Sequence, residues 1–394
     1  MPLLAPNPAG NRQKSRLRLT CGTRYIGAVG NRLDRHTILS HEWPYTAAAN
    51  GSFGNWAKEG CTVKGVRLCA NGFEVHGEDP LASLLAFLDS ILRGTGQVMF
   101  QNNSYTGLLF LIGIAYNSWL FALAVTLGTA VSTLTAMAMG ADRILVRSGM
   151  FGFNGGLVGI ALLYFLQPVP LTWACLILAA ACSTIVMGAM LAAFDMWKLP
   201  ALTAPFVFVS LCFFLATARF GRMELTGLLP TAGLPKTAVV EGVVDASTIA
   251  QGLLNGIGQV FFQENLVTGA LFAAGLLIAS RVAFAAALAG SLGGLLVAWG
   301  MGAAEPAIRA GAFGFNSVLV GIALSSVFLA PNRTAIGYAT FGVVVTPFVV
   351  AALAAALEPL GLPALTLPFV LVTWVFVLAC RQFERFRGDQ EASA

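Results

Sequence analysis

The side chains best suited to recognising a solute in this sequence are amides, hydroxyls and phenyl rings, and they occur twice in the same order. Gln97 and Phe100 return in the second half of the chain as Gln259 and Phe262, with the same spacing. Amide and hydroxyl oxygens accept hydrogen bonds, and flat ring faces favour planar molecules. An unpaired polar group costs roughly 2–7 kcal/mol in apolar surroundings, so this series of acceptors suits a small, planar, uncharged molecule rich in N–H groups.

Acid–base and metal chemistry have little support in the body of the chain, which begins at residue 81. All three histidines, His36, His41 and His76, precede it. The charged residues of the body mostly fall at the ends of apolar segments, and its four cysteines show no paired spacing. The sequence therefore predicts neither an enzyme nor a protein that holds a metal or another cofactor.

The equivalent residues belong to a tandem duplication that covers the body. Three motifs occur in the same order in both copies, and the last of them is offset by one residue more than the other two. The pairs that they define are Gln97/Gln259, Val98/Val260, Phe100/Phe262, Phe153/Phe315, Leu157/Leu319 and Thr203/Thr366. Internal duplication is common in transporters and channels, whose substrate path lies where the two repeats meet.

Composition indicates a membrane protein. Of 394 residues, 57% are hydrophobic and only 10% are charged, whereas soluble domains average about 25% charged residues. The apolar blocks approach the ~20 residues that cross a bilayer as a helix. The segment 1–80 holds 10 basic and 6 acidic side chains, which leaves 13 and 12 for the body, so the net charge of +5 is no sign of nucleic-acid binding.

Each copy contains six apolar elements. In the first copy they span residues 81–101, 104–116, 118–139, 150–166, 170–193 and 199–220. Several are short or interrupted by Gly, Asn or Pro, and broken backbone at membrane depth must be buried in protein or line a cavity. We expect an all-α polytopic membrane protein whose repeats each have five transmembrane helices and one re-entrant half-helix. An odd number of crossings inverts the second repeat relative to the first.

The expected domains follow from this division. Residues 1–80 are expected to be a disordered tail or a mis-called extension, 81–235 the first membrane repeat, 236–380 the second, and 381–394 a C-terminal tail. Because both ends of the chain are basic, the positive-inside rule places both termini in the cytoplasm. The repeated Asn154 and Asn316 lie beside glycines, where they could either line the path or cap broken backbone.

Together the repeated motifs resemble those of the urea transporter family. They are Gln-Val-x-Phe-x-x-Asn, Gly-Phe-Asn-x-x-Leu-Val-Gly and Pro-Ala-Leu-Thr-x-Pro-Phe, and the resemblance covers about residues 84–380. It implies a homotrimer in the cell (inner) membrane. Each protomer would carry its own pore and pass urea down its gradient across the lipid bilayer.

Carried over position by position, the resemblance implies two constrictions and a middle section between them. The implied constrictions are Gln97, Val98 and Phe100 in one copy and Gln259, Val260 and Phe262 in the other. The implied middle is Thr203 and Thr366, and further walls are implied at Phe153, Leu157, Phe315 and Leu319.

Two classes of transport stay open at this stage. The first is a passive channel for urea and, to a lesser degree, small amides, which fits the neutral character of the repeated residues. The alternative is an ion-coupled secondary transporter of a small polar solute. Inverted repeats with broken helices also occur in such transporters, and Glu264 lies near one of the two constrictions.

Overall fold

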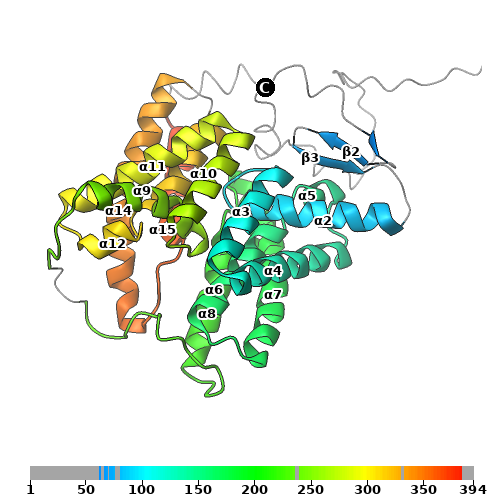
Figure 1. The fold of residues 1–394 in the computed structure, drawn as a ribbon, viewed down its shortest axis with the longest axis horizontal. Coiled ribbons are helices and arrows are strands. Elements are labelled where there is room, and N and C mark those ends of the chain that lie inside the picture. The colour runs from blue at the N-terminus through cyan, green and yellow to red at the C-terminus, as the bar shows by residue number, and fades with distance from the viewer. Residues whose placement is uncertain are drawn as a thin grey trace, which may run out of the picture. The chain divides into compact units, whose positions relative to one another are not determined.

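The computed structural model describes residues 62–63, 66–69, 71–75, 80–235, 239–329 and 332–383. All of them belong to one compact unit that spans Trp43–Ala394. Most of the expected N-terminal tail and residues 384–394 of the expected C-terminal tail lie outside the described residues. The described body is helical, which confirms the all-α fold class (Figure 1).

The first copy is coloured cyan to green in Figure 1 and the second yellow to red. The helices of the first copy are α2 (Pro80–Gln97), α3 (Ser104–Asn117), α4 (Trp119–Ala138), α5 (Arg143–Arg147), α6 (Gly152–Phe165), α7 (Pro170–Phe194), η3 (Asp195–Trp197) and α8 (Ala204–Thr217). Those of the second are α9 (Ala246–Gly258), η4 (Gln259–Phe261), α10 (Leu266–Ala279), α11 (Arg281–Gly300), α12 (Glu305–Arg309), α13 (Gly314–Ile322), η5 (Ala323–Val327), α14 (Arg333–Leu357), η6 (Glu358–Leu360) and α15 (Leu367–Cys380). The duplication seen in the sequence is therefore a duplication of helices.

Five helices in the described part of the chain are long and apolar enough to cross a membrane, and α9 with α10 makes a sixth if this pair, bent by 75°, counts as one span. Three shorter apolar helices are α6, α8 and α15. These findings confirm a polytopic membrane protein. Five crossings per repeat remain a prediction.

The two copies meet along α3 and α10 through reciprocal hydrogen bonds. Thr106 near the start of α3 donates to the carbonyl of Gly275 near the end of α10, at 2.8 Å. Thr268 near the start of α10 donates to the carbonyl of Gly113 near the end of α3, also at 2.8 Å. The two helices are therefore antiparallel, as equivalent helices of inverted repeats must be when they pack side by side.

Equivalent residues of the two copies also touch each other directly. The rings of Phe110 and Phe272 have centroids 4.8 Å apart, and the hydroxyls of Thr203 and Thr366 are 2.6 Å apart. A residue meets its own counterpart only on a two-fold axis. Both pairs therefore lie on the pseudo-two-fold axis that relates the repeats, which supports the inverted arrangement.

Gly107 lets α3 cross α2 at backbone contact. A Cβ atom at this position would lie 1.8 Å from the carbonyl oxygen of Leu92, a contact that no side-chain movement can relieve. We expect Gly107→Ala to lower the free energy of unfolding by about 3 kcal/mol or more, because the two helices must separate. Thermal unfolding in detergent measures this.

Gly188 within α7 is the matched control, since a Cβ there meets no atom within 4 Å. Gly188→Ala is expected to be neutral or stabilising by up to about 1 kcal/mol, because alanine is the better helix former. Equal unfolding temperatures for the two alanine variants would contradict the close crossing of α2 and α3.

A small sheet precedes the first helix, in a region for which we expected no regular structure. Strands β1 (Thr62–Val63), β2 (Val66–Cys69) and β3 (Gly72–Val75) are antiparallel, with Cys69 opposite Gly72. The Asn71-Gly72 pair between two short apolar runs is a strong hairpin signal that the sequence analysis missed. The sheet contacts the body through the Phe73 amide, which donates to the Asp89 carboxylate at 3.3 Å.

The second copy begins with a capping box. The carboxylate of Asp245 accepts hydrogen bonds from the Thr248 amide at 2.8 Å and from the Ser247 hydroxyl at 2.9 Å. These bonds, first of all that from the Thr248 amide, lower the pKa of Asp245 from 3.8 to about 2. A lowered carboxyl pKa stabilises the fold above pH 3.8, and that contribution disappears as the pH falls towards 2.

Asp245→Asn tests this contribution because asparagine keeps a capping oxygen and removes only the charge. We expect the variant to unfold at a lower temperature than the parent protein at pH 7, and the difference to close near pH 2. Thermal unfolding over that pH range is the measurement. A difference that persisted unchanged at pH 2 would show that the charge is not its cause.

Candidate functional site

Residues with strained backbone lie at, or directly before, several of the predicted site residues. Five non-glycine residues in the described part of the chain have positive φ: Phe100, Lys198, Leu202, Phe262 and Leu365. Four of them form two pairs of equivalent residues. Phe100 and Phe262 are the predicted ring residues, and Leu202 and Leu365 directly precede the predicted threonines. Each such residue costs of order 1–3 kcal/mol and persists only where its surroundings enforce it.

The turn at Phe100 is fixed by its neighbours. The Phe100 amide donates to the carbonyl of Gln97 at 2.9 Å, where α2 ends. The side-chain amide of Gln101 donates to the carbonyl of Met99 at 2.7 Å, and the Asn103 side chain caps α3. The second copy repeats this turn, with Phe262 in the left-handed conformation after η4. Both predicted constrictions therefore have the same backbone.

Asn154 fixes the second strained turn of the first copy. Its Nδ2 donates to the carbonyl of Leu202 at 3.3 Å, and its Oδ1 accepts from the amide of Phe206 at 3.1 Å. Both ends of the side chain are thus occupied by the backbone on either side of Thr203. The structure assigns Asn154 the capping role that the sequence left open.

Asn316 does the same in the second copy. Its Nδ2 donates to the carbonyl of Leu365 at 3.2 Å, and its Oδ1 accepts from the amide of Phe369 at 3.1 Å. The two asparagines therefore support the turns that present Thr203 and Thr366. Asn316 also lines the cavity described below.

The hydroxyls of the two threonines do not hydrogen-bond the helices that follow them. Thr203 and Thr366 precede α8 and α15, and neither side chain caps its helix. Their hydroxyls bond each other, with side chains 2% and 3% exposed. A threonine in a membrane helix commonly bonds the carbonyl four residues before it, so this direct pairing on the axis is a distinct arrangement.

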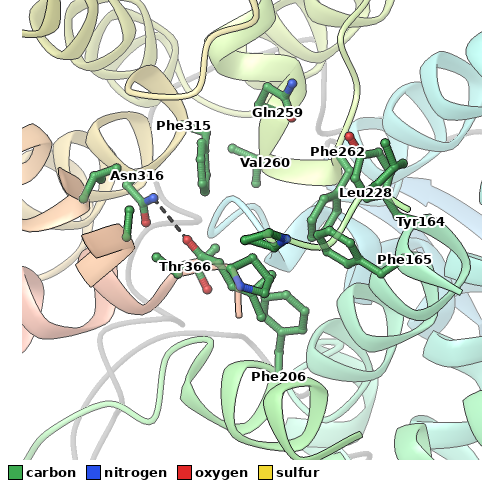
Figure 2. Close-up of a pocket in the computed structure, with 16 residues that line it drawn as sticks. Tyr164, Phe165, Phe206, Leu228, Gln259, Val260, Phe262, Phe315, Asn316 and Thr366 are labelled. Carbon is green, nitrogen blue, oxygen red and sulfur yellow. Dashed lines mark hydrogen bonds between the residues drawn. The ribbon is translucent and has the colours of Figure 1, made fainter. Parts of the chain in front are cut away.

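A cavity of about 310 Å³ lies where the two copies and the segment between them meet. The predicted site residues that line it are Gln259, Val260, Phe262, Phe315 and Thr366. Figure 2 shows Gln259, Val260 and Phe315 on one side, Thr366 and Phe206 below, and Tyr164, Phe165 and Phe262 on another side. Tyrosine is the only ionisable residue type among the lining residues, and the wall is otherwise apolar or neutral.

The other predicted site residues do not line this cavity. Thr203 adjoins this cavity through its bond with Thr366. The first-copy set is buried, with exposures of 8% or less, and does not line the cavity; it comprises Gln97, Val98, Phe100, Phe153 and Leu157. Leu319 is fully buried and also lies outside the lining. The structure thus brings the residues of the predicted second-copy constriction, Gln259, Val260 and Phe262, together with Thr366 around one cavity.

The two predicted glutamines differ in their bonding. Gln97 donates from Nε2 to the carbonyl of Ser148 at 3.0 Å, and no donor among the described residues reaches its Oε1. Gln259 is half-buried on the cavity wall, and no described group hydrogen-bonds its amide. Gln97 is therefore an oriented acceptor, whereas the amide of Gln259 is free to turn.

Five lining residues from the first copy and the segment that joins the copies were not predicted from the sequence. They are Tyr164 and Phe165 at the end of α6, Phe206 on α8, and Leu228 and Pro230 before α9. Phe165-Leu166-x-Pro168 does recur in the second copy, as Phe328-Leu329-x-Pro331, with the larger of the two offsets. That repeat was the available signal for Phe165, whereas the joining segment has no counterpart in the sequence.

No Asp, Glu, Lys or Arg of the described residues lines the cavity, and some of these charged groups form ion pairs elsewhere. On α2, Nε of Arg93 lies 2.6 Å from Oδ2 of Asp89. On α12, Nη2 of Arg309 lies 2.6 Å from Oε1 of Glu305. Glu264, which motivated the ion-coupled alternative, is exposed and is absent from the cavity lining. The geometry suits binding of a neutral solute.

Comparison with known proteins finds similar sequences. The family described as urea transporter matches residues 88–381. Urea transporter 1 of Rattus norvegicus is 31% identical over 303 residues, which cover 75% of this chain and 77% of that protein. Urea transporter 1 of Ovis aries is 31% identical over 302 residues with the same coverage.

Proposed function

Because the chain belongs to the urea transporter family, we propose that it conducts urea passively through an uncharged pore between its two inverted repeats. The observation that carries the proposal is the neutral cavity, built by both copies and lined by Thr366 of the Thr203/Thr366 pair. A solute that occupies it meets acceptors and ring faces and no fixed charge. No covalent chemistry is involved, and the protein is not an enzyme.

Urea would move along a series of acceptors. The Oε1 of Gln97, the two threonine hydroxyls and the amide of Gln259 offer successive partners for its N–H groups. Each bond replaces one lost to water, whose absence would cost roughly 2–7 kcal/mol. Binding at each position must remain weak, or the solute would not leave.

The rings of Phe100 and Phe262 would select by shape. A flat slot admits a planar molecule edgewise and rejects bulky solutes, and the apolar walls reject hydrated ions through the cost of desolvation. Formamide and acetamide share the planar amide group, so we expect both to permeate more slowly than urea. The uncharged lining gives no support to ion coupling.

Further features are proposed from the family resemblance. We expect a homotrimer in the cell (inner) membrane, with one pore in each protomer and both termini in the cytoplasm. The basic residues near the end of the body, Arg381 among them, agree with that orientation under the positive-inside rule.

Stopped-flow light scattering from proteoliposomes tests the proposed function. Urea, formamide, acetamide, glycerol and ammonium are compared with protein-free liposomes of the same lipid. We expect fast urea flux, slower amide flux, glycerol and ammonium at the protein-free rate, and no change when proton and sodium gradients are collapsed. Urea flux that depends on either gradient would establish the ion-coupled alternative instead.

A further inference from the structure

The offset between the two copies grows by one residue at one defined place. Leu162 corresponds to Leu324, whereas the residues that begin α7 and α14, Pro170 and Arg333, lie one residue further apart. The second copy therefore contains one additional residue between these points. The equivalent stretch of the first copy is the regular end of α6 and the loop that follows it.

A π-helical turn accommodates the additional residue. The segment η5 (Ala323–Val327) directly follows α13, and the amide of Phe328 donates to the carbonyl of Ala323, five residues back, at 2.9 Å. The hydroxyls of Ser325 and Ser326 donate to carbonyls four residues before them, at 2.6 and 2.7 Å. Such turns are single-residue insertions into helices and occur often at functional sites.

The π-turn makes Phe328 the structural equivalent of Phe165. If the segment were regular α-helix, the additional residue would place Val327 opposite Phe165. In the structure, the ring of Phe165 lies edge-on to Phe262, with centroids 5.9 Å apart and planes at 88°. The ring of Phe328 lies edge-on to Phe100, with centroids 6.1 Å apart and planes at 89°. The two contacts therefore have nearly the same geometry.

Each of these contacts joins the two repeats. Phe165 belongs to the first copy and touches the constriction ring of the second, while Phe328 belongs to the second copy and touches the constriction ring of the first. The touched rings stand on strained backbone, with φ values of 63° at Phe100 and 57° at Phe262. A ring on such backbone keeps one orientation only if its neighbours enforce it.

We infer that Phe165 and Phe328 are positioning residues that hold the planes of Phe262 and Phe100, and that they thereby set the selectivity of the pore for planar solutes. The π-turn supports this role because it absorbs the additional residue. In a regular α-helix that residue would move the Phe328 ring away from Phe100. The inference rests on the proposed function, since it concerns the selectivity of the same pore.

The experiment compares urea and glycerol permeability in proteoliposomes for Phe165→Leu, Phe328→Leu and Phe328→Tyr. Leucine fills similar volume without a ring edge, whereas tyrosine keeps the edge. Because an edge-on ring pair contributes about 0.5–1.5 kcal/mol, we expect each leucine variant to lower the urea-to-glycerol ratio by about two- to tenfold. Phe328→Tyr should keep the parent ratio. Phe208→Leu, which alters a phenylalanine 56% exposed on α8, is the matched control.

Deletion of Ser326 tests the role of the π-turn. Removing the additional residue should return the segment to regular α-helix, as in the first copy, and leave Phe328 in contact with Phe100. The urea-to-glycerol ratio should therefore stay at the parent value, and combining the deletion with Phe328→Leu should lower the ratio as much as Phe328→Leu alone. A deletion variant whose ratio falls as in Phe328→Leu would overturn the role of the turn.

The outcomes separate this inference from the proposed function. Absence of urea flux in the parent protein would reject the function itself. Parent flux together with unchanged ratios in both leucine variants would overturn the inference alone. An equal loss of urea and glycerol flux, with the ratio preserved, would also overturn it, because it would indicate general damage to the fold.

Discussion

Phe100→Ala is expected to lower the urea-to-glycerol permeability ratio by about tenfold, mainly by admitting glycerol. The Phe100 ring is 8% exposed and contacts the rings of Phe369 and Phe328, with centroids 5.9 and 6.1 Å away. Its removal would leave a space lined by ring edges in place of a flat wall. Shape discrimination in apolar sites amounts to about 1–3 kcal/mol, which sets the size of the expected change.

Stopped-flow measurements on Phe100→Ala and Phe208→Ala give the comparison, since both replace a phenylalanine by alanine and only the first lies at the proposed constriction. Phe208→Ala is expected to retain the parent ratio. Gln97→Ala is expected to lower urea flux instead, because it removes the oriented acceptor held by the Ser148 carbonyl. Unchanged urea flux and unchanged discrimination in both Phe100→Ala and Gln97→Ala would contradict the proposed path.

The helical elements and their duplication were predictable from the sequence. The expected elements 104–116 and 118–139 are α3 and α4, and the boundary between these helices is the capping residue Ser118. The prediction succeeded because membrane helices show as long apolar runs and because two copies report on one pattern. The repeat alone also paired Thr203 with Thr366, which the structure shows in contact.

Contacts between distant segments were not predictable. Gln97 and Gln259 are equivalent in sequence, yet only Gln97 has a partner, the carbonyl of Ser148, among the residues that the structure describes. The corresponding residue of the second copy is Ala310, whose carbonyl makes no such bond with Gln259 in the described structure. A repeat fixes which residues correspond, but the bonds of each depend on small displacements that no motif records.

The π-turn was also beyond a motif-based comparison. Such a comparison registers that the offset grows by one residue, but does not say whether a loop or a helix absorbs the addition. The structure places the additional residue inside a helix, where the π-turn interrupts the regular α-helical hydrogen bonding and keeps Phe328 against Phe100. Features that break a local rule are the ones where function is expected.

The threonine pair offers the second large expected effect. The double variant Thr203→Val with Thr366→Val keeps the shape of both side chains and removes both hydroxyls from the axis. One hydroxyl donates to the other at 2.6 Å, so oxygen lone pairs remain available to a passing N–H group. We expect urea flux to fall about tenfold in the double variant, because a buried polar group without a partner costs about 1–3 kcal/mol.

Thr340→Val supplies the matched control for this loss. Thr340 is exposed on α14, and its hydroxyl bonds the carbonyl of Ile336 at 2.9 Å, so its replacement removes a hydroxyl away from the axis. Urea flux per reconstituted protein is expected to be unchanged there. The single variants Thr203→Val and Thr366→Val should each lose less than the double variant, because one acceptor remains. A double variant that conducts urea at the parent rate would mean that urea flux does not depend on these hydroxyls.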